Sequence, residues 1–135
     1  MLSGRVASAL LVEDNEQNLE LASFLLTEAG FELCPARDLD EARRVLRSFT
    51  PDVVLMDMNV KGADGLTLVA EIRAEPRLQR VPVLALTAHA MRGDRERFLA
   101  AGCDGYLPKP IDVKSFAQEV ARYLRPQARQ KEEQP

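Results

Sequence analysis

The acidic pair Glu13 and Asp14 stands directly after a short apolar run, in the stretch "LLVEDN" at residues 10–15. Two adjacent carboxylates repel each other, and the repulsion needs compensation. One interpretation is a helix cap, with Asp14 or Asn15 at the first turn of the following helix. The other is a cation site. The choice between the two determines which functions the chain can have.

Other polar residues follow apolar runs in the same way. Asp57 closes the third run, Thr87 the fourth and Lys109 the fifth. Each has an ordinary structural explanation, since Asp57 could begin a turn, Thr87 could form a side-chain turn and Lys109 could be a solvated charge. Ligands of open parallel sheets bind outside the carboxyl ends of the strands. Five polar groups at one such edge are together better explained as a site.

The residue types define the chemistry of such a site. Three carboxylates in one pocket favour a divalent cation, and oxygen ligands without His or Cys favour Mg²⁺, which often shares its coordination shell with phosphate oxygens. A lysine and a threonine hydroxyl opposite the metal could hold the remaining phosphoryl oxygens. A carboxylate can also accept a phosphoryl group covalently. A bound cation would then explain why Glu13 and Asp14 are adjacent.

Short apolar runs alternate with amphipathic segments along the chain, which predicts the elements that position these residues. Continuous apolarity over so few residues is typical of strands that are covered on both faces. Helices are predicted from the apolar periodicity, with Asp38 and Asp112 as N-caps and Gly30 and Gly102 at helix ends. The predicted strands are 7–12, 31–34, 53–56, 83–86 and 106–107, and the predicted helices are 17–29, 39–49, 66–75, 91–100 and 113–124. Strict alternation predicts an α/β fold with a parallel sheet and helices on both faces.

The composition narrows the classes of protein. The chain has 135 residues, a net charge of −3 and two cysteines, Cys34 and Cys103. One domain suits this length, and the charge balance does not indicate nucleic-acid binding. We expect two thiols rather than a disulfide. The chain shows neither a signal peptide nor an apolar run long enough to span a membrane, so we expect a cytoplasmic protein that binds no membrane.

The four motifs together resemble the receiver domain of two-component response regulators. They are "LLVEDN", "DVVLMDMNVKGADG" at 52–65, "VPVLALTAHA" at 81–90 and "GCDGYLPKPID" at 102–112, and the resemblance covers residues 7–124. It implies the flavodoxin-like (βα)5 fold, a doubly wound five-stranded parallel sheet of order 2-1-3-4-5. We expect residues 1–125 to form the receiver domain and residues 126–135 to be a polar, disordered tail.

The resemblance also implies roles for single residues. Asp57 matches the phosphoacceptor, and Lys109 the lysine that pairs with the phosphoryl group. Asp14 matches a direct Mg²⁺ ligand, Glu13 an acid that acts through metal-bound water, and Asn59 the position whose backbone carbonyl binds the metal. Asp57 is itself a ligand of that metal.

Further matches concern the response to phosphorylation. Thr87 matches the hydroxyl that moves toward the phosphate, and Tyr106 the aromatic switch residue. Lys109–Pro110 matches a cis peptide of the family. His89 and Asn59 border the phosphate approach and should modulate the lifetime of the acyl phosphate.

The implied function is that of a phosphorylation-activated signalling receiver, which is not an enzyme although it assists its own phosphotransfer and autodephosphorylation. A sensor histidine kinase or a histidine phosphotransfer protein would phosphorylate Asp57 with Mg²⁺. The signal would pass through the face formed by the fourth helix, fifth strand and fifth helix to a downstream protein. Residues 91–100 have a thin apolar face, which suits an element that moves. We expect a stand-alone receiver, monomeric or weakly dimeric.

Two points leave the interpretation open. The family often has Met-Pro where this chain has Val60 and Lys61. The Lys61 side chain could be a solvent-exposed charge, or it could weaken metal binding by lowering the negative charge of the site. In the second case Lys61→Ala would bind the metal more tightly. The alternative function is a receiver-fold adaptor that is not phosphorylated. Such proteins usually lack Asp57, Asp14 or Lys109, and this chain has all three.

Overall fold

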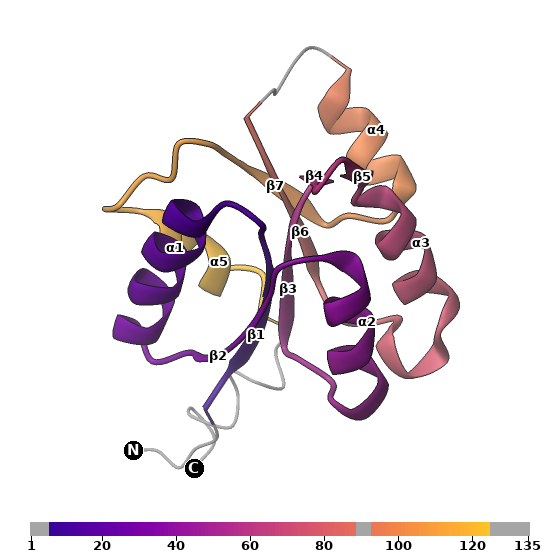
Figure 1. The fold of residues 1–135 in the computed structure, drawn as a ribbon, viewed down its shortest axis with the longest axis horizontal. Coiled ribbons are helices and arrows are strands. Elements are labelled where there is room, and N and C mark those ends of the chain that lie inside the picture. Colours follow the sequence, from indigo (N-terminus) through magenta and orange to yellow (C-terminus); the bar gives the residue numbers. More distant parts are fainter. Residues whose placement is uncertain (1–5, 89–92, 125–135) are drawn as a thin grey trace.

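A five-stranded parallel sheet forms the centre of the protein in the computed structural model, which describes residues 6–88 and 93–124 (Figure 1). The strand order β2-β1-β3-β6-β7 is the predicted 2-1-3-4-5 arrangement, counted along the parallel strands. The second strand lies slightly later than predicted because it pairs residue by residue with β1, from Ser8 with Glu32 to Val12 with Ala36. The strands are β1 (Ser8–Val12), β2 (Glu32–Ala36), β3 (Val53–Asp57), β6 (Val83–Thr87) and β7 (Gly105–Pro108).

Helices cover both faces of the sheet, α1 and α5 on one face and α2, α3 and α4 on the other (Figure 1). The three central strands β1, β3 and β6 are buried along their whole length, as their continuous apolar runs predict. One apolar cluster joins the sheet to Leu26 and Phe116, and a second joins it to Leu46, Ile72 and Phe98. The sheet is therefore held rigidly between two cores.

The helices begin and end close to the predicted positions, except for the last helix of the chain. Asn15 caps α1 through its side chain, which accepts a hydrogen bond from the N–H of Asn18, and Asp38 caps α2 as predicted. The helices are α1 (Glu16–Glu28), α2 (Leu39–Ser48), α3 (Leu66–Ala74), α4 (Asp94–Ala101) and α5 (Phe116–Ala121), with a short 3-10 helix η1 (Pro76–Leu78) after α3.

The prediction of a helix over residues 113–124 with Asp112 as its cap was wrong in its bounds. The Asp112 carboxylate accepts a hydrogen bond from the N–H of Lys114, and its carbonyl accepts from Ser115 and Phe116. These contacts make a turn before α5, because an aspartate side chain that bonds the backbone two residues on mimics a backbone turn. The helix itself spans six residues.

Helix α4 is thinly anchored, as its sequence indicates. Phe98 is its buried apolar residue, whereas Leu99 is 41% exposed. Gly102 ends the helix in the left-handed conformation, at a φ of 118°. Residues 91 and 92 of the predicted helix lie outside the described residues, as does the predicted tail from residue 126 onward.

A two-stranded hairpin, which the sequence analysis did not predict, follows β3. Strands β4 (Asn59–Val60) and β5 (Ala63–Asp64) pair antiparallel, with Lys61 and Gly62 between them. Both central residues have positive φ, 50° for Lys61 and 81° for Gly62, as in a type I′ turn.

Two further expectations concern the whole chain. Cys34 and Cys103 are free thiols, Cys103 buried and Cys34 half-buried. Within the described residues, no helix has the length and apolar character that crossing a membrane requires.

Candidate functional site at the carboxyl edge of the sheet

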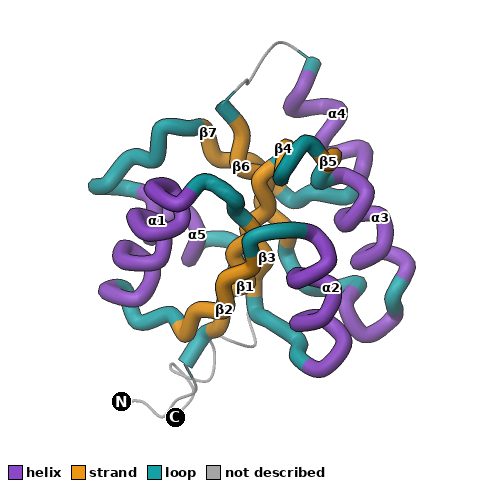
Figure 2. The backbone as a smooth tube through the Cα atoms, viewed as in Figure 1, coloured by secondary structure: helices purple, strands orange, loops and turns teal. Residues whose placement is uncertain are grey.

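The strands β1, β3, β6 and β7 end at one edge of the sheet, where the loops after β1 and β3 lie (Figure 2). Glu13 directly follows β1, and Asp57 is the last residue of β3. Thr87 is the last residue of β6, and Lys109 directly follows β7. Parallel strands end at the same edge, so residues far apart in sequence meet there.

Glu13, Asp14 and Asp57 form an acidic cluster. One carboxylate oxygen of each lies within 4.8 Å of the corresponding oxygens of the other two. Glu13 is fully buried, Asp57 is 7% exposed and Asp14 is half-buried. Like charges this close destabilise one another unless a cation or hydrogen bonds offset the repulsion.

The ammonium of Lys109 is the cation that the described residues themselves supply to this cluster. Its Nζ lies 2.8 Å from Glu13 Oε1 and 3.2 Å from Asp57 Oδ2. Glu13 Oε2 accepts a hydrogen bond from the N–H of Asn15. Glu13 Oε1 is buried, and its contact with the Lys109 ammonium has the distance of an ion pair but a poor angle for a hydrogen bond. This buried oxygen keeps an unused acceptor site.

Burial and neighbouring charges shift the pKa values of Glu13 and Lys109 in opposite directions. Burial raises the pKa of the Glu13 carboxyl, and Lys109 lowers it by less. Burial also lowers the pKa of Lys109, but its contact with Glu13 and the charges of both carboxylates outweigh that effect and raise the pKa overall. Lys109 is therefore held as the ammonium, the form that can neutralise negative charge at this edge.

Asp14 and Asn59 lie at the solvent side of the cluster. Asp14 Oδ2 accepts a hydrogen bond of 2.8 Å from the backbone N–H of Lys61, and the N–H of Asn59 donates to Asp57 Oδ1 at 3.1 Å. Because Asn15 caps α1 with its own side chain, Asp14 is not needed as the helix cap. Of the two interpretations of the acidic pair, a cation site therefore suits Asp14 better.

A pocket of about 350 Å³ opens beside Asp57. Its walls come from the ends of β3 and β6, from α4 and from Lys109, so Asp57, Thr87 and Lys109 line the same pocket. The residues that line it are Asp57, Met58, Asn59, Thr87, Ala88, Asp94, Arg97, Phe98 and Lys109. Thr87 is 6% exposed, and its carbonyl accepts a hydrogen bond from the N–H of Lys109.

Tyr106 lies on β7, next to α4 rather than in the acidic cluster. Its half-buried ring packs against the core on the α4 face, and the guanidinium of Arg95 lies 6.0 Å from the ring centroid. That distance is at the limit of a cation–π contact. The peptide Lys109–Pro110 is cis, as the resemblance implies. His89 lies outside the described residues.

The acidic cluster fits Mg²⁺. Its donors are carboxylate oxygens, with a backbone carbonyl at Asn59 nearby in sequence, and Mg²⁺ prefers such ligands. The unused acceptor site on the buried Glu13 Oε1 suits a metal-bound water, which would donate a hydrogen bond to it. Two residues that complete the local geometry, Lys61 and Asn15, were not identified from their sequence context as contacts of the acids.

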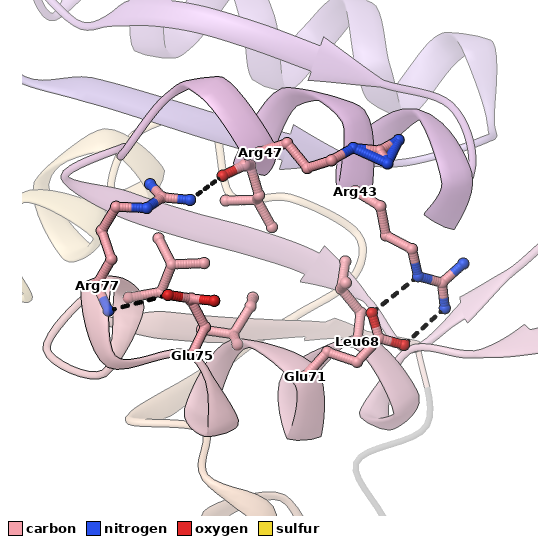
Figure 3. Close-up of a pocket in the computed structure, with 9 residues that line it drawn as sticks. Arg43, Arg47, Leu68, Glu71, Glu75 and Arg77 are labelled. Atoms are coloured by element: carbon pink, nitrogen blue, oxygen red, sulfur yellow. Dashed lines mark hydrogen bonds and ion pairs between the residues drawn. The ribbon is translucent and has the colours of Figure 1, made fainter.

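A second pocket lies between α2 and α3, and none of its lining residues belongs to the acidic cluster (Figure 3). Its volume is about 310 Å³, and its lining residues are Arg43, Leu46, Arg47, Leu68, Glu71, Ile72, Glu75, Arg77 and Leu78. Arg43 forms a bidentate ion pair with Glu71, and Arg77 donates to the carbonyl of Leu46 (Figure 3). These contacts tie α2 to the segment from α3 to η1.

The fold and this site define a signalling receiver, and the chain belongs to the response regulator receiver domain family, whose model matches residues 9–121. A relative is the polar-differentiation response regulator DivK of Brucella anthropi. It is 38% identical over 117 residues, which cover 87% of this chain and 95% of the relative.

Solved structures agree with this assignment. The receiver domain of a sensor histidine kinase from Pseudomonas aeruginosa PAO1 is 35% identical, with a TM-score of 0.79 over 88% of this chain and 98% of that chain. That structure has a magnesium ion coordinated in its active-site cleft. The chemotaxis response regulator CheY4 of Vibrio cholerae is 27% identical, with a TM-score of 0.84 over 89% of this chain and 100% of that chain. Receiver domains act in signalling and bind Mg²⁺ in their active site, and this chain has an acidic cluster whose ligands suit such an ion.

Proposed function

We propose that this chain is a phosphorylation-activated receiver that accepts a phosphoryl group on Asp57. The donor is a sensor histidine kinase or a histidine phosphotransfer protein, and the acceptor of the signal is another protein. The observation that carries the proposal is that Asp57 both belongs to the acidic cluster and faces Lys109 at the border of an open pocket.

Glu13, Asp14, Asp57 and the carbonyl of Asn59 would hold Mg²⁺ at this site. When bound, the metal neutralises charge on the transferred group and on the carboxylates. Glu13 is buried beside Lys109, and following the resemblance to the family we assign it to the metal through a water molecule. Asp14 and Asp57 are direct ligands in this proposal.

The transfer step needs a nucleophile and a stabilised set of phosphoryl oxygens. A carboxylate oxygen of Asp57 attacks phosphorus, an O–P bond forms, and the P–N bond to the donor histidine breaks with its electron pair on the imidazole nitrogen. Lys109 loses part of its pairing with Asp57 and moves its ammonium to the phosphoryl oxygens. The hydroxyl of Thr87, which lines the same pocket, donates a hydrogen bond to another of these oxygens.

The same geometry supports a route from the site to a surface. Thr87 ends β6, and Tyr106 lies on the neighbouring strand β7 beside the thinly anchored α4. Movement of Thr87 toward the phosphoryl group would release space for the ring of Tyr106 and alter the face formed by α4, β7 and α5. Such a local electrostatic change biases a two-state element. His89 and Asn59 would tune the lifetime of the acyl phosphate, which water hydrolyses.

Intact-mass measurement tests the proposal. The wild type is incubated with acetyl phosphate, with Mg²⁺ or with a chelator, and Asp57→Asn is treated in parallel as the matched control. We expect a gain of one phosphoryl group in the wild type that requires Mg²⁺ and is absent in Asp57→Asn. A folded wild type that gains no phosphoryl group from acetyl phosphate or from a histidine phosphotransfer donor would contradict the proposal and favour an adaptor that is not phosphorylated.

A further inference from the structure

The hairpin after β3 contacts the acidic cluster through its turn. Asn59 pairs with Asp64 and Val60 with Ala63, so Lys61 and Gly62 form a two-residue turn. A turn with positive φ at both central residues is usually built from Asn-Gly or Gly-Gly. Lys61 is the non-glycine residue with positive φ among residues 6–88 and 93–124. A lysine in this conformation is unusual, because its Cβ crowds the backbone there.

The backbone of Lys61, rather than its charge, makes the contact with the cluster. Its N–H donates to Asp14 Oδ2 at 2.8 Å. Its side chain is 58% exposed, with Nζ 4.0 Å from Asp38 Oδ2. The hydrogen bond fixes one oxygen of Asp14 while the carboxylate stays within 4.8 Å of Glu13 and Asp57. Without it, repulsion from those two acids would favour Asp14 rotamers that point toward solvent.

Proline at this position, which the family often has, would remove the contact for two reasons. Proline has no backbone N–H, and its ring fixes φ near −65°. It could therefore neither donate to Asp14 nor adopt the φ of 50° that the turn requires. The departure from the Met-Pro pattern at Val60 and Lys61 thus makes both the turn and the hydrogen bond available in this chain.

We propose that Lys61 is a positioning residue for the magnesium site, and that its N–H holds the Asp14 carboxylate in the arrangement that binds Mg²⁺. This inference rests on the proposed function, because it concerns the same metal site. It assigns the contribution of Lys61 to the backbone and the turn. The side-chain ammonium has no part in it.

Three variants of the full chain separate these contributions. Lys61→Pro removes the N–H and the turn, whereas Lys61→Asn keeps the N–H and suits positive φ. Lys61→Ala keeps the N–H and removes the charge. The readout is the Mg²⁺ dissociation constant, from amide chemical shifts during a titration, because the chain has no tryptophan for fluorescence. We expect Lys61→Pro to weaken Mg²⁺ binding about tenfold, since hydrogen bonds to charged groups exceed the ~1.4 kcal/mol that tenfold represents.

The two other variants serve as matched controls. We expect Lys61→Asn and Lys61→Ala to bind Mg²⁺ within about threefold of the wild type, a range smaller than the loss of one charge-assisted hydrogen bond. Equal affinities of the Pro and Asn variants would overturn the proposal. So would a loss in Lys61→Ala as large as that in Lys61→Pro.

A second measurement does not depend on the folding of Lys61→Pro. The Lys61 amide of the metal-free wild type should exchange with solvent at least about tenfold more slowly than in Asp14→Ala, because the hydrogen bond must open before exchange. Equal exchange rates would overturn the proposal. If instead the wild type neither binds Mg²⁺ nor accepts a phosphoryl group, the proposed function fails, whatever the Lys61 variants do.

Discussion

Replacing Lys109 with methionine would test the electrostatic structure of the site. Methionine keeps most of the apolar stem and removes the ammonium. Nζ now lies 2.8 Å from the fully buried Glu13 and 3.2 Å from Asp57. In metal-free protein the change leaves two buried carboxylates without their cation, and because they are buried, water can stabilise their charges only weakly.

The size of the effect follows from burial. Removing one partner of a buried ion pair costs about 3–5 kcal/mol, because the remaining charge is left uncompensated. Asp57 borders the open pocket and can recover part of its hydration. We therefore expect the lower end, about 3 kcal/mol of lost unfolding free energy in metal-free protein at neutral pH. Domains of this size have about 5–15 kcal/mol, so the variant should still fold.

The pH dependence has a defined sign. Burial already raises the pKa of Glu13 in the wild type, and loss of Lys109 raises it further. A folded carboxyl with a raised pKa binds its proton more tightly than the unfolded chain does, so stability increases as the pH falls through that pKa. The deficit of Lys109→Met should therefore be full above the raised pKa of Glu13 and should shrink on acidification.

The unfolding free energies of the wild type and Lys109→Met can be measured by urea unfolding, monitored by far-ultraviolet circular dichroism, with a chelator present and at several pH values. Lys114→Met, on the exposed turn before α5, is the matched control and should change stability by less than about 0.5 kcal/mol. If Lys109→Met were as stable as the wild type in the chelator, or if its deficit grew on acidification, the reasoning about the buried charges would be refuted.

Three further predictions concern the surroundings of the site. In Gly65→Ala the new Cβ would lie 2.6 Å from the carbonyl oxygen of Asp57. We therefore expect less phosphorylation by intact mass and a lower unfolding midpoint in urea. An unchanged midpoint would contradict the close approach. Arg73→Met removes hydrogen bonds to Gly102, Gln79, Val81 and Asp104 and should cost about 2–4 kcal/mol in urea unfolding; a cost under about 1 kcal/mol would show that these bonds add little. Burial raises the pKa of the Cys103 thiol to about 11, so iodoacetamide at pH 8 should label it in urea but not in the folded protein, and fast native labelling would argue against its burial.

The apolar runs predicted the parallel sheet and the edge at which the polar residues gather, whereas the strand order came from the resemblance to receiver domains. Asp57 and Thr87 close runs that are buried along their whole length, as strands inside a layered sheet require, whereas Lys109 follows the short, partly buried strand β7. The ends of parallel strands then place these residues together without further information. The cap at Asp38 was equally local, since an N-cap contact spans three residues.

Other features depended on tertiary contacts that the sequence does not display. The Lys61 turn was not predicted, because lysine gives no sign of positive φ, although the following Gly62 is a usual turn residue. The hydrogen bond from Lys61 to Asp14 joins residues 47 positions apart. The length of α5 was overestimated from its apolar periodicity, because Asp112 forms a turn that delays the first helical residue.

The place of β7 at the end of the strand order has a mechanical consequence. Glu13 follows β1 and Asp57 ends β3, and both strands lie in the inner part of the sheet. Tyr106 lies on β7 and Lys109 directly follows it, and β7 is joined to the sheet through its pairing with β6. Separation of β7 from β6 would displace Lys109 and Tyr106 together without breaking the pairing of β1 with β3. The fold thus places the two carboxylates at strands that have neighbours on both sides, and the lysine and the tyrosine at a strand on the edge of the sheet.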